Sequence, residues 1–167
     1  MVSAELFKEL MAYSDHHELC EKAGKTAILD FQTRNSIVLP SDLIAVYEHF
    51  DGGEIFIPGT VIYGLEPNDR RMTLREANAK TRRSSFSIPN HYLIFAKLNF
   101  GDLLCVNLND PYDVIQWDHE NDEQYCTWPS ISECLKEAVN WVPSRFMRKI
   151  VCRLRRSEVS RQRRRRP

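Results

Sequence analysis

The sequence contains no long hydrophobic run. Its apolar stretches are only a few residues long, such as Leu93-Ile94-Phe95-Ala96, whereas a helix that spans a bilayer needs roughly 20 apolar residues. The amino-terminal residues include the acidic Glu5 and Glu9 and lack the basic-then-apolar order of a secretory signal. We therefore expect no transmembrane segment and a cytoplasmic location.

The chain also lacks a cysteine framework. Its five cysteines are scattered without CxxC spacing, which is typical of reduced thiols. At 167 residues, of which 43% are hydrophobic and 28% charged, the chain has an ordinary globular composition and room for one domain. A chain of about 150 residues buries roughly 70% of the surface that it exposes when unfolded. The fold therefore needs neither a disulfide nor a structural metal.

The common catalytic signatures are missing as well. The sequence has no GxxxxGK[ST] phosphate loop, no GxGxxG after a strand, no GxSxG elbow and no HExxH pair. We therefore expect a protein that is not an enzyme and that uses no cofactor.

Two segments contain histidine beside other ligand-type residues. His16, His17 and Cys20 could lie on one helical turn and bind a metal, but no fourth ligand is indicated, so a polar helix surface with one buried thiol is the default reading. The segment 117–123 places four carboxylates around His119, which could serve as metal ligands or as an acid and a base. Contiguous acids in a turn more often form a solvated loop. A metal-dependent hydrolase centred on His119 is thus our third functional hypothesis.

The zero net charge hides a strong asymmetry. Residues 143–167 contain eleven Arg or Lys residues and one acid, Glu158, so this segment carries a charge of +10. Residues 1–142 hold 12 basic and 22 acidic residues and carry −10. Such an asymmetry indicates which partners the protein can bind and says little about its fold.

Helical periodicity occurs in several segments. It predicts a helix over residues 4–23, with Ser3 as the N-cap and Gly24 at its end, and a second helix from Ser41 to Phe50. Ser41 is expected to accept hydrogen bonds from the first turn of that second helix, and a glycine beyond Asp51 to close it. Residues 25–36 fit a short helix or a strand equally well.

Strand-like segments dominate the second half. Residues 54–57 and 60–63 are short candidates, and residues 92–98, 103–108 and 114–118 are joined by turns that indicate an antiparallel meander. Residues 69–85 are expected to be a surface insertion with one helix. Ser130 and Glu133 have capping-box spacing before a last helix that ends at Pro143. The predicted class is α+β, with a mainly antiparallel or mixed sheet and helices packed on it.

Several motifs resemble those of a known superfamily. The order Leu39-Pro40-Ser41-Asp42-Leu43, Tyr47 and Asp51-Gly52-Gly53 is similar to the "LP-x-x-[FL]…[FY]…NGG" opening of the SUKH superfamily, which includes the fungal cell-wall-assembly regulator (Smi-Knr-like domain) and bacterial immunity proteins. Downstream, the matching pieces are Ile94-Phe95-Ala96, Gly101-Asp102, Asn107, Val114, His119-Glu120 and Ser132-Glu133-Cys134-Leu135. The resemblance covers residues 28–142. Asp51 replaces the usual Asn, and Asn107 or Asn109 the usual Asp.

The resemblance implies a binding module without a catalytic centre. Bacterial members are similar to immunity proteins that bind and block a cognate toxin, often a nuclease. Read from the residues alone, Gly52, Gly53 and Gly101 permit positive backbone angles, and Asp51, Asp102 and His119 can bond nearby amides and hold turns. The structural motif positions are thus Pro40, Gly52, Gly53, Gly101, Asp102 and His119.

The acidic charge suggests where a partner binds. A body of charge −10 complements a basic toxin and would raise the rate of association. The loop that follows the family-like strand carries the candidate partner-binding residues Asp118, Glu120, Asp122 and Glu123. We expect this loop to be part of the recognition surface.

The basic tail forms a separate segment, residues 143–167, after a SUKH-like domain at 1–142. Phe146, Ile150, Val151 and Leu154 have helical spacing, and Arg163, Arg164, Arg165 and Arg166 follow. The tail could contact nucleic acid, adsorb to anionic lipid or dock on the acidic body, or it could have no dedicated role. A nucleic-acid-associated adaptor that acts through this tail is therefore the alternative function.

Overall fold

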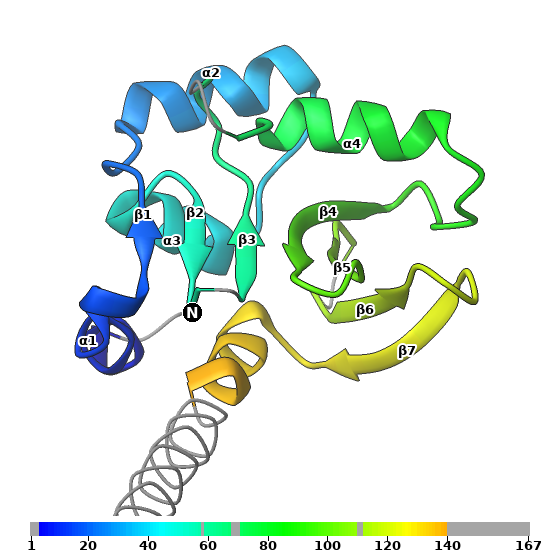
Figure 1. The fold of residues 1–167 in the computed structure, drawn as a ribbon. Coiled ribbons are helices and arrows are strands. Elements are labelled where there is room, and N and C mark those ends of the chain that lie inside the picture. The colour runs from blue at the N-terminus through cyan, green and yellow to red at the C-terminus, as the bar shows by residue number, and fades with distance from the viewer. Residues whose placement is uncertain (1–3, 58, 68–70, 110–111, 140–167) are drawn as a thin grey trace, which may run out of the picture.

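A seven-stranded antiparallel sheet organises the chain (Figure 1). The structure is a computed structural model that describes residues 4–57, 59–67, 71–109 and 112–139. Each strand pairs with its neighbour in sequence, in the order β1 to β7. The strands are β1 (Glu18–Leu19), β2 (Gly53–Ile55), β3 (Thr60–Ile62), β4 (Tyr92–Leu98), β5 (Leu103–Asn107), β6 (Val114–Asp118) and β7 (Glu123–Trp128).

Helices pack around this sheet and bury its central strands. They are α1 (Ala4–Met11), the 3₁₀ turn η1 (Ser14–His16), α2 (Lys25–Asn35), α3 (Ser41–His49), α4 (Leu74–Arg83) and a helix over residues 131–139. Four consecutive residues of β5 are buried, and so are four of β6. Because successive strand residues point to opposite faces, both faces of the sheet are covered there. The α+β class is therefore confirmed.

The predicted meander is present, and the sheet extends beyond it. Strands β4, β5 and β6 pair in sequence order as the turn residues indicated. A further strand, β7, pairs with β6 at the edge of the sheet. The sequence reading missed β7 because most of its side chains are exposed and polar, so it has no apolar alternation.

The predicted helix over residues 4–23 is wrong beyond Met11. Helix α1 ends there, and η1 and β1 follow, so His16, His17 and Cys20 do not share a helical turn. The ring of His17 explains part of this path. Its Nε2 lies 2.9 Å from the carbonyl oxygen of Leu10, and its Nδ1 accepts from the amide of Phe56 at 3.0 Å. The ring thus ties the last turn of α1 to the β2–β3 turn.

The caps of the next two helices also differ from the prediction. Gly24 does not end a helix but precedes α2. The sequence of residues 25–36 fitted a helix or a strand, and the structure shows the helix. Ser41 is the first residue of α3 rather than its N-cap; Pro40 holds that position, and its carbonyl oxygen accepts from Leu43 and Ile44. Phe50, in extended conformation, ends α3 before the glycines.

Helix α4 belongs to the core rather than to a surface insertion. The predicted helix is present, but its Leu74 and Ala77 are buried against β4. The Asn78 amide bonds both backbone groups of Ile94, donating to the carbonyl at 2.8 Å and accepting from the N–H at 3.0 Å. This helix is therefore fastened to the middle of the sheet.

The last helix begins as predicted. The Ser130 hydroxyl accepts from the Glu133 amide at 3.2 Å, which is one half of a capping box, while the Glu133 carboxylate accepts from Lys136. Ile131, Leu135 and Val139 are buried in the core. The predicted end at Pro143, the domain boundary at residue 142 and the arginines 163–166 lie outside the described residues.

Candidate protein-binding site

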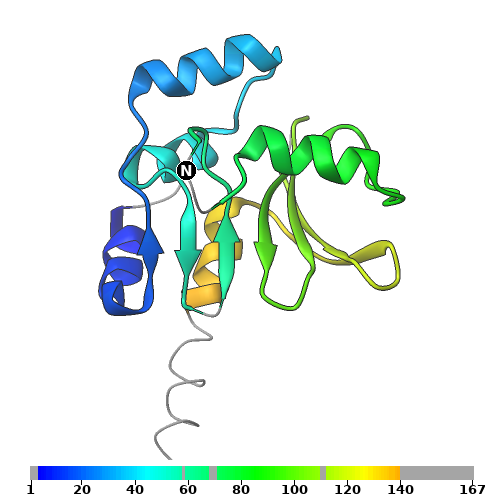
Figure 2. The same cartoon turned by 45° about the horizontal axis from the view of Figure 1, so that its top comes forward.

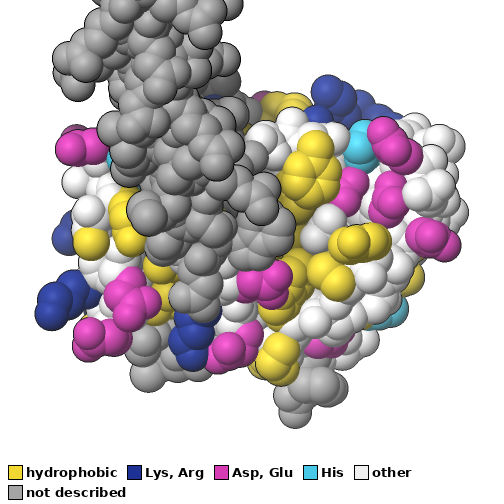
Figure 3. Space-filling model, turned by 60° about the horizontal axis from the view of Figure 1, so that its bottom comes forward, with side chains coloured by type: hydrophobic (Ala, Val, Ile, Leu, Met, Phe, Trp, Pro, Cys, Tyr) yellow, Lys and Arg dark blue, Asp and Glu magenta, His cyan; other side chains and the backbone are white. Residues whose placement is uncertain are grey.

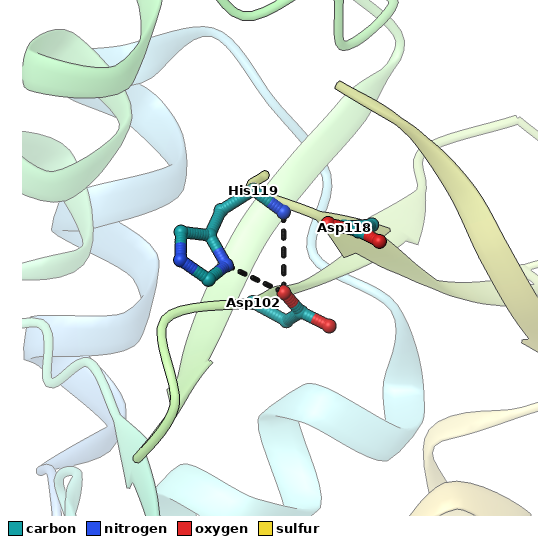
Figure 4. Close-up of side chains that lie close together, drawn as sticks. All are labelled: Asp102, Asp118 and His119. Atoms are coloured by element: carbon teal, nitrogen blue, oxygen red, sulfur yellow. Dashed lines mark hydrogen bonds and ion pairs between the residues drawn. The ribbon is translucent and has the colours of Figure 1, made fainter. Parts of the chain in front are cut away.

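Asp102 links two neighbouring hairpin turns. This buried residue lies between β4 and β5, and its Oδ1 accepts from the backbone amide of His119 at 3.1 Å and lies 2.7 Å from Nδ1 of the same residue (Figure 4). Its Oδ2 accepts from Nε2 of Gln116 at 2.6 Å. Asp102 thus accepts from a backbone amide, as predicted, whereas the His119 ring bonds the Asp102 carboxylate instead of an amide.

Gly101 makes room for the His119 ring. Its φ is 118°, and a Cβ atom built there would lie 2.6 Å from Cε1 and Nε2 of His119. No side chain fits at that distance, and positive φ is unfavourable for residues other than glycine. Gly101, Asp102 and His119 thus form one structural unit that joins the β4–β5 turn to the β6–β7 turn.

The same residues could in principle bind a metal. One ligand atom each of Asp102, Asp118 and His119 lies within 4.8 Å of the others. Both oxygens of Asp102 and both oxygens of Asp118 already accept hydrogen bonds from the protein. A metal ion would have to replace these bonds, so the arrangement fits the holding of turns better than metal chemistry.

The acidic turn between β6 and β7 is shaped by two of its four acids. Asp118 accepts from the amides of Glu120 and Asn121 and from the Asn121 side chain. These bonds, the one from the Asn121 side chain first, lower the pKa of Asp118. Asp118 therefore remains charged while it fixes the start of the turn.

Asp122 fixes the other half of the turn. Its φ is 54°, and its carboxylate accepts from the hydroxyl and amide of Ser87 and from Nε1 of Trp117 at 2.9 Å. The hydrogen bonds from Ser87, followed by the one from Trp117, lower the pKa of Asp122. Glu120 and Glu123, by contrast, are exposed. They are the acids of this turn that can meet a partner at little structural cost.

Asp51, Gly52 and Gly53 form a second corner, between α3 and β2, whereas Pro40 is the N-cap of α3. The Asp51 carboxylate accepts from the amides of Leu65 at 2.7 Å and Glu66 at 3.0 Å. Gly52 (φ 75°) and Gly53 (φ 133°) have the predicted positive angles. An added Cβ would lie 2.5 Å from the backbone of Gly64 or Glu18, respectively. This corner builds the sheet and lies apart from the acidic turn in sequence.

Sequence reasoning missed the residues that brace the acidic turn. Ser87 lies 35 residues from Asp122 along the chain, and no local pattern indicated that contact. A similar long-range bond joins Asp42 of α3 to the amide and hydroxyl of Ser132, 90 residues away. Burial would raise the pKa of Asp42, but hydrogen bonds, including those from Ser132, lower it on balance.

Together, the fold and the site define a class of protein: an α+β domain whose antiparallel meander ends in a braced, acidic hairpin. The chain belongs to the SMI1 / KNR4 family (SUKH-1), whose pattern matches residues 22–137. The suspected SUKH resemblance is therefore confirmed. Comparison with curated proteins gave no match. No helix among the described residues is long and apolar enough to cross a membrane.

Proposed function

We propose that this chain is a non-enzymatic, cytoplasmic protein-binding domain that acts as an immunity protein. It binds and neutralises a cognate toxin with a basic surface, for which a nuclease is the leading example. The observation that carries the proposal is the acidic β6–β7 turn, which is braced from within and presents Glu120 and Glu123 to solvent. Family membership supports a role in binding.

The bracing matters for affinity. A loop that is already fixed by the bonds of Asp118 and Asp122 loses less conformational entropy when a partner binds. Negative charges on such a loop steer a basic protein toward it and raise the association rate. The geometry therefore suits fast recognition of a cationic surface.

The bonding of the Asp102–His119 pair supports the non-enzymatic part of the proposal. General acid or base catalysis requires a group that can reach a substrate proton. Here Oδ1 of Asp102 and Nδ1 of His119 bond each other at 2.7 Å, and Gly101 packs against the ring. This pair stabilises two turns.

The test is co-expression with the product of the adjacent open reading frame. We expect that product to be toxic alone and harmless in the presence of this chain. Replacing the two exposed acids in Glu120→Gln/Glu123→Gln should slow association and reduce its salt dependence, whereas the control Glu66→Gln should not. A neighbour that is not toxic, or a double variant that protects and associates like the parent, would contradict the proposal.

The arginine-rich tail supports a second candidate function, that of a nucleic-acid-associated adaptor. Eleven basic residues within 143–167 favour phosphate contacts. Binding to RNA or DNA that falls steeply with salt and is lost in Arg163→Ala/Arg164→Ala/Arg165→Ala/Arg166→Ala would favour this function over toxin neutralisation.

A further inference from the structure

Three hairpin turns meet at one end of the sheet. Because neighbouring strands are antiparallel, the β2–β3, β4–β5 and β6–β7 turns all follow the same strand ends; in Figure 2 the first two lie at the lower side of the sheet and the β6–β7 turn lies at its right. Successive hairpins are two strand spacings apart, about 10 Å. We call this surface the hairpin end and define it by residues 56–57, 99–102 and 118–123.

The hairpin end combines apolar and acidic side chains. Phe100 is 60% exposed and Ile57 is 47% exposed, so two of the three turns present a large apolar side chain. Glu120 and Glu123 are exposed in the neighbouring turn. Figure 3 views the molecule from below, and it shows a band of hydrophobic side chains with acidic side chains on both sides of it and Lys or Arg side chains above the acids on the right. A ligand for this surface would need both positive charge and apolar groups.

The acidic turn concentrates negative charge within the hairpin end. Residues 118–123 contain four acids and no Arg or Lys, and Lys97 in β4 is the basic residue near the β4–β5 turn. Helix α4 carries Arg75, Lys80, Arg82 and Arg83 against Glu76, and its C-terminal end approaches the acidic turn, since Ser87, four residues beyond Arg83, bonds Asp122. The exposed acids of the β6–β7 turn are therefore the part of the hairpin end that attracts a cationic segment.

The chain supplies such a segment close by. The helix over residues 131–139 runs toward the hairpin end in both ribbon views, so the sequence beyond residue 139 continues from there (Figures 1 and 2). Residues 143–167 carry +10 and include Phe146, Ile150 and Leu154. Even at a helical rise of 1.5 Å per residue, the chain from residue 139 to Arg163 covers about 36 Å. The tail therefore matches the surface in charge, apolar content and reach.

We propose that the arginine-rich tail, residues 143–167, docks on the hairpin end of its own chain. Its arginines lie beside Glu120 and Glu123, and its apolar residues lie beside Phe100 and Ile57. The inference goes beyond the proposed function and does not depend on it. Where a basic partner uses the same acidic turn, the tail competes with it and restricts binding to partners that can displace the tail.

The test uses the full chain with a photoreactive p-benzoylphenylalanine in place of Phe100. The matched control carries it in place of Tyr112, a 39% exposed aromatic in the β5–β6 loop at the opposite end of the strands. We expect position 100, but not position 112, to cross-link to peptides from residues 143–167, as mapped by mass spectrometry. At 1 M salt the Debye length is about 3 Å, so cross-linking should largely disappear.

Charge reversal provides the second measurement. In the position-100 chain, Glu120→Lys/Glu123→Lys should reduce cross-linking to the tail about tenfold. The control Glu66→Lys alters an exposed acid beyond the far end of β3 and should leave cross-linking unchanged. Thermal melts of each variant establish that the body is folded.

Three results would overturn the proposal. The first is equal cross-linking from positions 100 and 112, and the second is cross-linking that survives the charge reversal. The third result would come from a mixture of isotope-labelled and unlabelled chains. If every cross-link joined two different chains, the tail would dock on another copy and not on its own chain. None of these results depends on the identity of a toxin, so the proposed function is tested separately.

Discussion

At the residue scale, the contact between Gly101 and His119 is the strictest steric requirement in the acidic region. Gly101→Ala should destabilise the fold by about 1–3 kcal/mol, because the new Cβ meets the His119 ring at 2.6 Å and φ is 118°. Urea denaturation measures the change. In a His119→Ala background the same substitution should cost less, because the ring is gone while the unfavourable φ remains. Equal costs in the two backgrounds would mean that the ring does not occupy this position.

The acids of the turn predict how stability depends on pH. Hydrogen bonds from Ser87 and Trp117 lower the pKa of Asp122 below its ordinary 3.8. The folded state therefore binds this proton more weakly than the unfolded state, so the contribution to stability is present above the ordinary pKa and is lost as the pH falls through the lowered value.

We therefore expect Asp122→Asn to lose less stability than the parent when the pH is lowered from about 7 to about 3. Urea midpoints at the two pH values provide the measurement. The control Glu66→Gln removes a carboxylate without removing the bonds of the turn. If Asp122→Asn and the parent show the same decrease, the hydrogen bonds of Asp122 do not stabilise the fold.

The residue roles that the sequence could predict are those set by local backbone geometry. Gly52, Gly53 and Gly101 adopt the expected positive φ, and Asp102 accepts from a backbone amide as expected. The roles of Asp122 and Ser87 could not be predicted, since their bond joins segments 35 residues apart. Of the four acids predicted to bind a partner, two have structural duties that only the folded chain reveals, and their role in binding stays a prediction.

At the element scale, Asn78 fastens α4 to β4. Its amide bonds the N–H and the carbonyl of Ile94. Asn78→Ala should destabilise the protein by about 1–3 kcal/mol, because two buried backbone groups lose a partner. The matched control is Asn35→Ala, whose amide donates within α2 to the carbonyl of Phe31. Similar unfolding free energies for the two variants would show that α4 is not held by this pair of bonds.

Elements were predictable where local periodicity and burial agree. Strands β4 to β6 combine a clear pattern with buried positions, and they lie where expected, whereas the helix expected within residues 69–85 is present but belongs to the core. The predicted helix over residues 4–23 failed beyond Met11, where tertiary bonds of His17 to Leu10 and Phe56 determine the path of the chain. Strand β7 was missed because an exposed edge strand requires little apolar alternation.

At the scale of the whole molecule, topology and charge act together. A meander in which every strand pairs with its neighbour places alternate turns at the same end, so residues from three separate hairpins form one surface. The sequence indicated a charge of −10 on residues 1–142, but it could not show that the turn with four acids is joined to the β4–β5 turn, which carries the exposed Phe100. The composition of this surface is thus a property of the assembled sheet.

The tail provides the last prediction, which concerns the boundary of the domain. Ile131, Leu135 and Val139 already complete the buried face of the last described helix. Truncation after Val142 should therefore leave a chain that melts cooperatively, with its near-ultraviolet circular dichroism retained. Docking of the tail on an exposed surface adds little to the free energy of unfolding, since exposed ion pairs contribute about 0–1 kcal/mol each. Truncation after Glu133, which removes Leu135 and Val139, is the destabilised control. If the chain truncated after Val142 aggregates or loses its near-ultraviolet signal, residues beyond 142 belong to the core and the boundary lies further along the chain.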